Sequence, residues 1–415
     1  MADTARTLAP PTTGAPPIRP RRLRWVLGAE MLVNGLGRFT LMPVLGVVLA
    51  TQDPAAGPSV VGAGLLVHNA ATGVSSVLVN RYLSRLRYNT ALGLSMLLAA
   101  AGFGVLPYLH DAAALILALL VAGLGISAHT VLTPLLAADI IADDAGRNRM
   151  YSMFQIAGNA AAAVGPFLAA ALYVSTDARP LLTLVGGAYL VAGLILYLGL
   201  PGRMHPAPTS GRWPISRGAF ATAVRDPNSR RVVAITVIGM FVYAQFYSAF
   251  ALFVAYVIES PALRSVLLAL PAVAIVFVQA AVTGVSNRLL RAGRSPFLLL
   301  GVGSLLFGAA MLLLGAGLPL LVASFASVAV FAVAEMVFQP MLSTAFAALP
   351  MDSRLEAFGI RQLSWTIGSG AGSFVGGAVY LMCHHNHADH VYWLVLGAAT
   401  LAGTALLMLG ARRTA

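Results

Sequence analysis

The chain is a succession of long apolar runs separated by short polar breaks. A helix needs roughly 20 apolar residues to cross a bilayer core about 30 Å thick, and the runs have about that length. The breaks contain arginines or the Gly, Pro and Asp residues typical of turns. The pattern predicts twelve membrane-spanning helices, at residues 24–50, 60–80, 89–109, 112–138, 151–174, 179–200, 231–258, 262–286, 295–315, 318–346, 357–381 and 391–411. The predicted fold class is therefore all-α, a polytopic membrane protein.

The composition narrows the class of protein further. Hydrophobic residues make up 59% of the 415 residues and charged residues only 10%, whereas soluble domains carry charge on roughly a quarter of their residues. The net charge is +12, but the basic residues are all arginines spread between apolar runs, so we expect no nucleic-acid partner. The sequence has one cysteine, no phosphate-binding loop and no nucleophile–base pair. We therefore expect neither an enzyme nor a cofactor.

The distribution of the arginines predicts the orientation. Of the 26 arginines, 22 lie in the two tails and in every second loop, while the opposite loops hold only Arg179 and Arg264. Short arginine-rich loops stay on the cytoplasmic side, so both termini are expected there. The arginines of these loops also suit contacts with anionic lipid headgroups. The chain is expected to be a monomer.

The polar stretch 201–230, which holds five prolines, divides the chain into two sets of six spans. The predicted organisation is a Pro/Arg-rich cytoplasmic tail at 1–22, a six-helix bundle at 23–200, a cytoplasmic linker at 201–230, a second six-helix bundle at 231–411 and a tail at 412–415. The two bundles share a repeat at an offset of 206 or 207 residues, in which Asn80-Arg81 matches Asn287-Arg288, Pro134 matches Pro340, and Tyr173 matches Tyr380. This repeat predicts pseudo-symmetric halves that enclose a cavity between them.

These features resemble the major facilitator superfamily over nearly the whole chain. Within it the chain is similar to the drug:proton antiporters, in particular the bacterial multidrug exporters of the MdtH type, and this resemblance implies the bacterial plasma (inner) membrane. The family signature after the second span corresponds to the stretch around Asn80-Arg81, where Asn80 replaces an acid. Gly165-Pro166 in the fifth span resembles a signature of export, and Arg361 resembles an arginine of the MdtH-like branch. Leu119 stands where many drug antiporters have an arginine. The resemblance implies Asn80, Arg81, Gly165, Pro166, Asn287 and Arg288 as gating residues.

Three polar residues of the first span, Glu30, Asn34 and Arg38, are spaced four apart and share one helical face. Charge inside a membrane is costly, so such a face usually looks into a cavity or the bundle interior. Glu30 is therefore a candidate proton carrier, and Asn34 and Arg38 are candidates for the cavity wall. The alternative is a structural pairing of Glu30 with Arg38 or Asn34, or a Glu30 that lies near the interface.

The tenth span contains Glu335, the deepest acid of the sequence, and Gln339 beside Pro340. Gln339, and Arg361 of the eleventh span, are further candidates for the cavity wall. The repeat offset of 206 places His129 at the matching position of the other half, so the two titratable groups are expected to face each other across the cavity. We expect Glu335 to exchange protons in alternation with substrate. The alternative is a glutamate that only holds helices together, and His129 taken alone is typical of a satisfied interior histidine.

Two further clusters have a possible ligand-binding role. Tyr243, Gln245 and Tyr247 belong to an aromatic stripe of the seventh span that suits a flat, lipophilic or cationic compound, although the same spacing is typical of helix packing. The segment 383–390 combines one cysteine, four histidines and an aspartate, but its spacing matches no established metal site, so no metal is expected.

The function expected from these observations is secondary active transport, namely proton-coupled efflux of small organic molecules by alternating access. One alternative is a proton-coupled importer of a nutrient or siderophore. Another is a membrane receptor or scaffold that keeps the same fold without transport.

Overall fold

The structure is a computed structural model that describes residues 20–42, 45, 48–49, 64, 67–68, 70–73, 82, 85–172, 177–206 and 216–412. The first half contains α1 (Pro20–Leu41), α4 (Tyr88–Val105) with a 3₁₀ turn (Leu106–Tyr108), α5 (Ala112–Ile140), α6 (Asp144–Leu172) and α7 (Arg179–Gly199). The second half contains α9 (Pro227–Gln245), α10 (Ala251–Val257), α11 (Pro261–Arg291), α12 (Pro296–Gly315), α13 (Leu320–Ala347), α14 (Arg354–His385) and α15 (Asp389–Arg412). A π-helical turn (Phe246–Phe250) joins α9 to α10.

The helices confirm the predicted all-α membrane fold. Eleven of the twelve predicted spans coincide with helices. The remaining one, the second span at 60–80, lies mostly outside the described residues. Nine helices in the described part of the chain are long and apolar enough to cross a membrane. Several helix starts follow from local sequence, because a capping side chain precedes a proline that needs no hydrogen-bond partner for its nitrogen. Asp226 before Pro227, Ser260 before Pro261 and Ser295 before Pro296 each accept a backbone N–H of the first turn.

Each half has its own hydrophobic core. In the first half, α4 packs against α5 and α7, and α1 packs against α6 and α7. In the second half, α12 packs against α13 and α15, and α9 packs against α14. Close helix approach requires glycine at Gly165, where an added Cβ would lie 2.6 Å from the carbonyl carbon of Phe39. The α1–α6 contact therefore depends on the absence of a side chain at this position.

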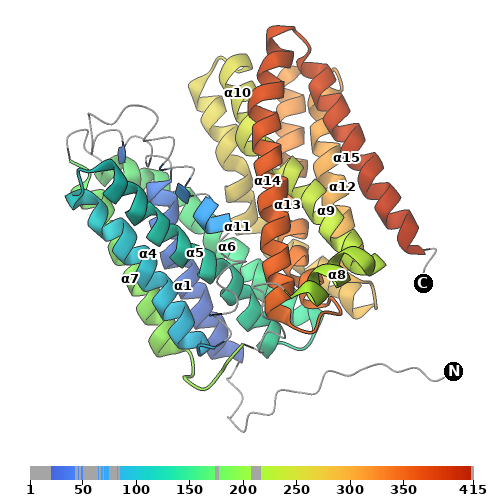
Figure 1. The fold of residues 1–415 in the computed structure, drawn as a ribbon. Coiled ribbons are helices and arrows are strands. Elements are labelled where there is room, and N and C mark those ends of the chain that lie inside the picture. Colours follow the sequence, from blue (N-terminus) through green and yellow to red (C-terminus); the bar gives the residue numbers. More distant parts are fainter. Residues whose placement is uncertain are drawn as a thin grey trace, which may run out of the picture.

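The two halves meet through α5, α6, α11, α13 and α14, and they converge toward one end of the molecule (Figure 1). This end, which we call the latch end, carries the connections 141–143 and 348–353, the start of α1 and the end of α15. Leu355 and Phe358 of α14 join the hydrophobic core of the first half there. Apolar side chains therefore contact one another across the two halves at the latch end.

The connection between the halves contains a short helix, α8 (Arg217–Arg225), at the latch end (Figure 1). Its Ala219 and Ala223 are buried, whereas Phe220 and Val224 are exposed. Glu356 of α14 accepts hydrogen bonds from the backbone N–H and the hydroxyl of Ser216, at 2.9 and 3.1 Å, and so fixes the start of α8. The predicted linker 201–230 therefore contains α8, and α9 already begins within it at Pro227.

Candidate functional site

Four polar residues lie at a common depth in the middle of the helices. At about 1.5 Å per residue, Glu30, His129, Gln155 and Glu335 are each roughly 15 to 18 Å from the latch-end terminus of their own helix. They come from α1, α5, α6 and α13, and therefore from both halves. This layer is the candidate functional site.

Glu335 is 4% exposed and bonds to side chains from both halves. Its Oε1 accepts a hydrogen bond from Gln155 Nε2 of α6 at 3.0 Å and a long one from the Tyr243 hydroxyl of α9 at 3.5 Å. Its Oε2 is buried without a hydrogen-bond partner. Within the described part of the chain no arginine or histidine pairs with this carboxyl group. An ionised Glu335 would therefore be an uncompensated charge, which is costly in an apolar surrounding.

An aromatic cluster of the second half reaches the Glu335 carboxyl group through Tyr243. The Tyr243 ring stacks on Phe331 with centroids 5.9 Å apart and also contacts Phe307 and Trp365. The Tyr243 and Tyr247 hydroxyls lie 3.2 Å apart, and Tyr247 remains 60% exposed. The π-helical turn that begins at Phe246 brings Tyr247 to this surface, in line with the frequent occurrence of such turns at functional sites.

In the first half, Glu30 and His129 form a buried pair. His129 Nε2 lies 2.8 Å from Glu30 Oε1, and Asn34 Nδ2 lies 3.5 Å from His129 Nδ1. If the amide of Asn34 donates to Nδ1, the ring proton is on Nε2 and points to the carboxylate. The predicted shared face of Glu30 and Asn34 thus converges on His129. The described contacts of His129 are with α1, and none is with Glu335.

The remaining predicted cavity residues separate into exposed and buried ones. Arg38 is exposed, with its guanidinium carbon 5.7 Å from the ring of Phe39, and Gln339 is half-buried with a 4.0 Å contact to the sulfur of Met240. Arg361 is buried and donates from NH2 to the carbonyl oxygen of Thr130 at 3.0 Å.

Gln245, another predicted cavity residue, bonds to neighbouring helices at both ends of its amide. It is fully buried, its Nε2 donates to the Gly372 carbonyl at 2.9 Å, and its Oε1 accepts from the Tyr392 hydroxyl at 2.6 Å. Both ends of the amide are therefore used in packing α9 against α14 and α15. These two bonds fit the helix-packing alternative that its spacing left open.

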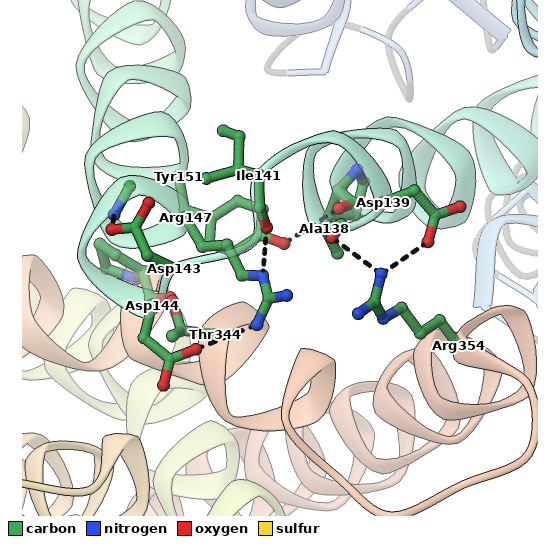
Figure 2. A network of polar contacts seen from close by, with 12 residues as sticks. Ala138, Asp139, Ile141, Asp143, Asp144, Arg147, Tyr151, Thr344 and Arg354 are labelled. Atoms are coloured by element: carbon green, nitrogen blue, oxygen red, sulfur yellow. Dashed lines mark hydrogen bonds and ion pairs between the residues drawn. The ribbon is translucent and has the colours of Figure 1, made fainter. Parts of the chain in front are cut away.

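At the latch end an ion pair joins the halves (Figure 2). Arg354 NH1 at the start of α14 donates to Asp139 Oδ1 at 3.1 Å and to the carbonyl of Ala138 at 3.0 Å. The hydroxyl of Tyr88 donates to the other oxygen of Asp139. Arg147 instead stays within the first half, where it bonds to Asp144 at 3.0 Å and to the carbonyl of Ile141 at 2.8 Å. We call the Arg354–Asp139 pair the latch.

The predicted gating residues are partly at the junction of the halves. Asn287 of α11 is buried and accepts a hydrogen bond from Asn148 of α6 at 2.6 Å, whereas Arg288 is exposed. Gly165 lies against α1, and Pro166 is exposed. Asn80 and Arg81 lie outside the described residues.

Sequence reasoning missed Gln155, Arg354 and Tyr88 as partners of the acids. Their residue types carry no signal in the sequence. The partners of Gln155 and Arg354 lie in the other half, and the partner of Tyr88 lies on a neighbouring helix of the same half. In the segment after Cys383, His384 pairs with Asp389 at 3.0 Å and stacks on Tyr256 and Tyr380. Across the described residues, no group of three or more His, Cys, Asp or Glu side chains is arranged to hold a metal ion.

Comparison with known proteins places this geometry in context. The family model of the Major Facilitator Superfamily matches residues 31–373, which is most of the chain. No curated protein sequence matches it. Among solved structures, the human organic anion transporter MFSD10 is 18% identical with a TM-score of 0.68, over 95% of this chain and 99% of that chain.

Two further solved structures share the arrangement of helices. The E. coli fucose:proton symporter is 14% identical with a TM-score of 0.67, over 92% of this chain and 97% of that one. A bacterial homologue of the iron transporter ferroportin, in an outward-facing state, is 17% identical with a TM-score of 0.61, over 94% of this chain and 98% of that one. The TM-scores show a common fold, and identities this low show the fold alone.

Proposed function

Because this chain belongs to the Major Facilitator Superfamily, we propose that it is a secondary active transporter that exports small organic molecules in exchange for protons. The observation that carries the proposal is the environment of Glu335. This acid lies in the layer shared by both halves, is bonded across the halves by Gln155, and has no cation partner among the described residues. A proton or a substrate would compensate the negative charge of this carboxyl group.

The exchange follows from the unpaired carboxyl group. When Glu335 is protonated, its charge is gone and the aromatic wall around Tyr243 presents only apolar surface and hydroxyl groups. When the proton leaves, the carboxylate becomes an acceptor beside flat rings, which favours a lipophilic molecule with a donor or positive group. Binding of proton and substrate is therefore mutually exclusive, which is the requirement for antiport.

The latch supports alternating access between two sides of a membrane. Arg354–Asp139, Asn148–Asn287 and the apolar contact of Phe358 close the latch end. The arginine-rich loops lie at this end, so the positive-inside tendency orients it toward the cytoplasm. The conformation is then closed to the cytoplasm, and the proton reaches Glu335 from outside. Rotation of one half against the other would break the latch and open the site inward.

Transport in proteoliposomes tests the proposal. Three probes of different charge, ethidium, carboxyfluorescein and glucose, are offered to vesicles with an acidic or an alkaline lumen. Antiport predicts accumulation of a probe in the acidic lumen, and symport predicts accumulation in the alkaline lumen. Glu335→Gln is expected to abolish the dependence on the gradient.

A matched substitution controls for the loss of a carboxyl group. Glu259 is an exposed acid at the end opposite the latch, between α10 and α11, and Glu259→Gln is expected to leave gradient-driven accumulation intact. Accumulation by Glu335→Gln that still follows the gradient would contradict the assignment of the proton site. Accumulation of a probe by the wild type only in the alkaline lumen would replace export by import.

A further inference from the structure

Two prolines lie at matching positions inside α5 and α13, and each leaves one backbone carbonyl without its helical partner. Pro134 in α5 and Pro340 in α13 have no N–H, so the carbonyl oxygens four residues earlier, those of Thr130 and Met336, lose their helical partners. A backbone carbonyl inside an apolar bundle needs another donor. The donor for each carbonyl must therefore come from a neighbouring helix.

The two free carbonyls are satisfied from different directions. The Met336 carbonyl accepts from Gln279 Nε2 of α11 at 3.0 Å, within the second half. The Thr130 carbonyl of the first half accepts from Arg361 NH2 of α14 at 3.0 Å, so this bond crosses between the halves. Equivalent gaps in the two halves thus have unequal effects on the junction.

Arg361 has few other ways to be satisfied. It is only 7% exposed, its Nε has no hydrogen-bond partner, and no carboxylate pairs with it in the described part of the chain. Its guanidinium carbon lies 5.6 Å from the ring centroid of Phe358 on the same helix. Because a buried cation without a partner is costly, the Thr130 carbonyl is the main polar anchor of Arg361.

The repeat supplies a second crossing bond at the equivalent place. The offset of 206 relates Gln155 of α6 to Arg361 of α14, and it relates His129, next to Thr130, to Glu335. Gln155 donates across the halves to Glu335, as Arg361 donates across the halves to Thr130. Each half therefore sends one side chain into the proline-containing helix of the other.

We propose that Arg361 is a positioning residue that clasps the two halves by filling the carbonyl gap made by Pro134. In this conformation it holds the closed end together beside the candidate site and is not a substrate ligand. Opening of the latch end breaks the bond to Thr130. The role in transport rests on the proposed function, but the clasp itself is a property of the closed conformation and can be measured without substrate or gradient.

Distances between spin labels test the clasp. In a Cys383→Ser background, cysteines replace Ala142 and Ala292, exposed residues of the two halves at the latch end, and the label pair is measured by pulsed electron resonance in nanodiscs. Arg361→Met is expected to raise the ratio of open to closed molecules at least about tenfold, the lower end of the effect of one hydrogen bond to a charged group. Arg361→Lys keeps a donor and is expected to return most of the closed population.

The prolines provide the decisive comparison. Pro134→Ala gives the helix its own donor for the Thr130 carbonyl, so it is expected to open the latch end as Arg361→Met does. The double variant is expected to be no more open than either single one, because both remove the same bond. Pro340→Ala is the matched control, because the carbonyl that Pro340 leaves free, that of Met336, is bonded within one half. It is expected to leave the ratio unchanged.

Several results would overturn the clasp. These are an unchanged ratio in Arg361→Met, an equal shift in Pro340→Ala, or additive shifts in the double variant. If Pro134→Ala does not fold, the Arg361→Met and Arg361→Lys comparison decides alone, and equal populations for these two would reject the clasp. If the ratios change as expected but Glu335→Gln still transports in response to the gradient, only the proposed proton site is rejected.

Discussion

Removal of the latch provides a quantitative test of how the closed end is held. Arg354→Met keeps much of the apolar stem and removes both hydrogen bonds, to Asp139 Oδ1 at 3.1 Å and to the Ala138 carbonyl at 3.0 Å. The side chains of Arg354 and Asp139 are 31% and 19% exposed. A surface ion pair contributes at most about 1 kcal/mol, and a hydrogen bond to a charged group about 1.5 to 3 kcal/mol.

The partial exposure places the latch between these limits, at roughly 2 kcal/mol, which corresponds to about a 30-fold change in the ratio of open to closed molecules. The change is measured with the label pair at Ala142 and Ala292 in nanodiscs. Asp144→Asn is the control, because the Arg147–Asp144 pair, with its 3.0 Å contact, lies within one half (Figure 2). A shift of the same size in the control, or no shift in Arg354→Met, would refute the assignment of the latch.

Three other substitutions have distinct expected outcomes. Gly165→Val is expected to lower the unfolding temperature measured by differential scanning fluorimetry, since even a Cβ would lie 2.6 Å from the backbone of Phe39; an unchanged temperature would show that α1 and α6 can separate freely. Gln245→Leu removes two buried hydrogen bonds and is expected to cost about 2 kcal/mol of stability, while the gradient dependence of transport stays as in the wild type. Loss of that dependence with normal stability would indicate that Gln245 lines the cavity. His129→Leu leaves the buried Glu30 without its 2.8 Å partner and is expected to lower stability more than Glu30→Gln combined with His129→Leu does; equal unfolding temperatures for the two would argue against the pair.

The sequence was sufficient to predict the helices because membrane crossing imposes a length and an apolar composition that few other structures need. The same argument located Glu335, since an acid in the middle of an apolar run has to find a polar environment. The faces of single helices were also predictable, and the four-residue spacing of Glu30 and Asn34 does bring both against His129.

Contacts between helices could not be predicted in the same way. The partner of Glu335 is Gln155, 180 positions earlier in the chain, and the partner of Asp139 is Arg354 at the start of α14, 215 positions later. Gln245 shares a stripe with Tyr243, but it faces α14 and α15 because a helix in a bundle is surrounded by neighbours. Spacing gives the direction of a side chain on its own helix, and packing decides what lies there.

The two separate hydrophobic cores have a consequence for how the protein is made. Most buried apolar residues of α1 to α7 belong to one core, and most of those of α9 to α15 belong to another. The exceptions are Ala347, Leu355 and Phe358, which join the core of the first half, and a small separate cluster of Ile275, Ala332 and Met336. During synthesis the earlier bundle can reach its final packing before the later one leaves the ribosome. Two separately encoded polypeptides, divided in the connection near α8, should consequently assemble into a working molecule when they are produced together in one cell.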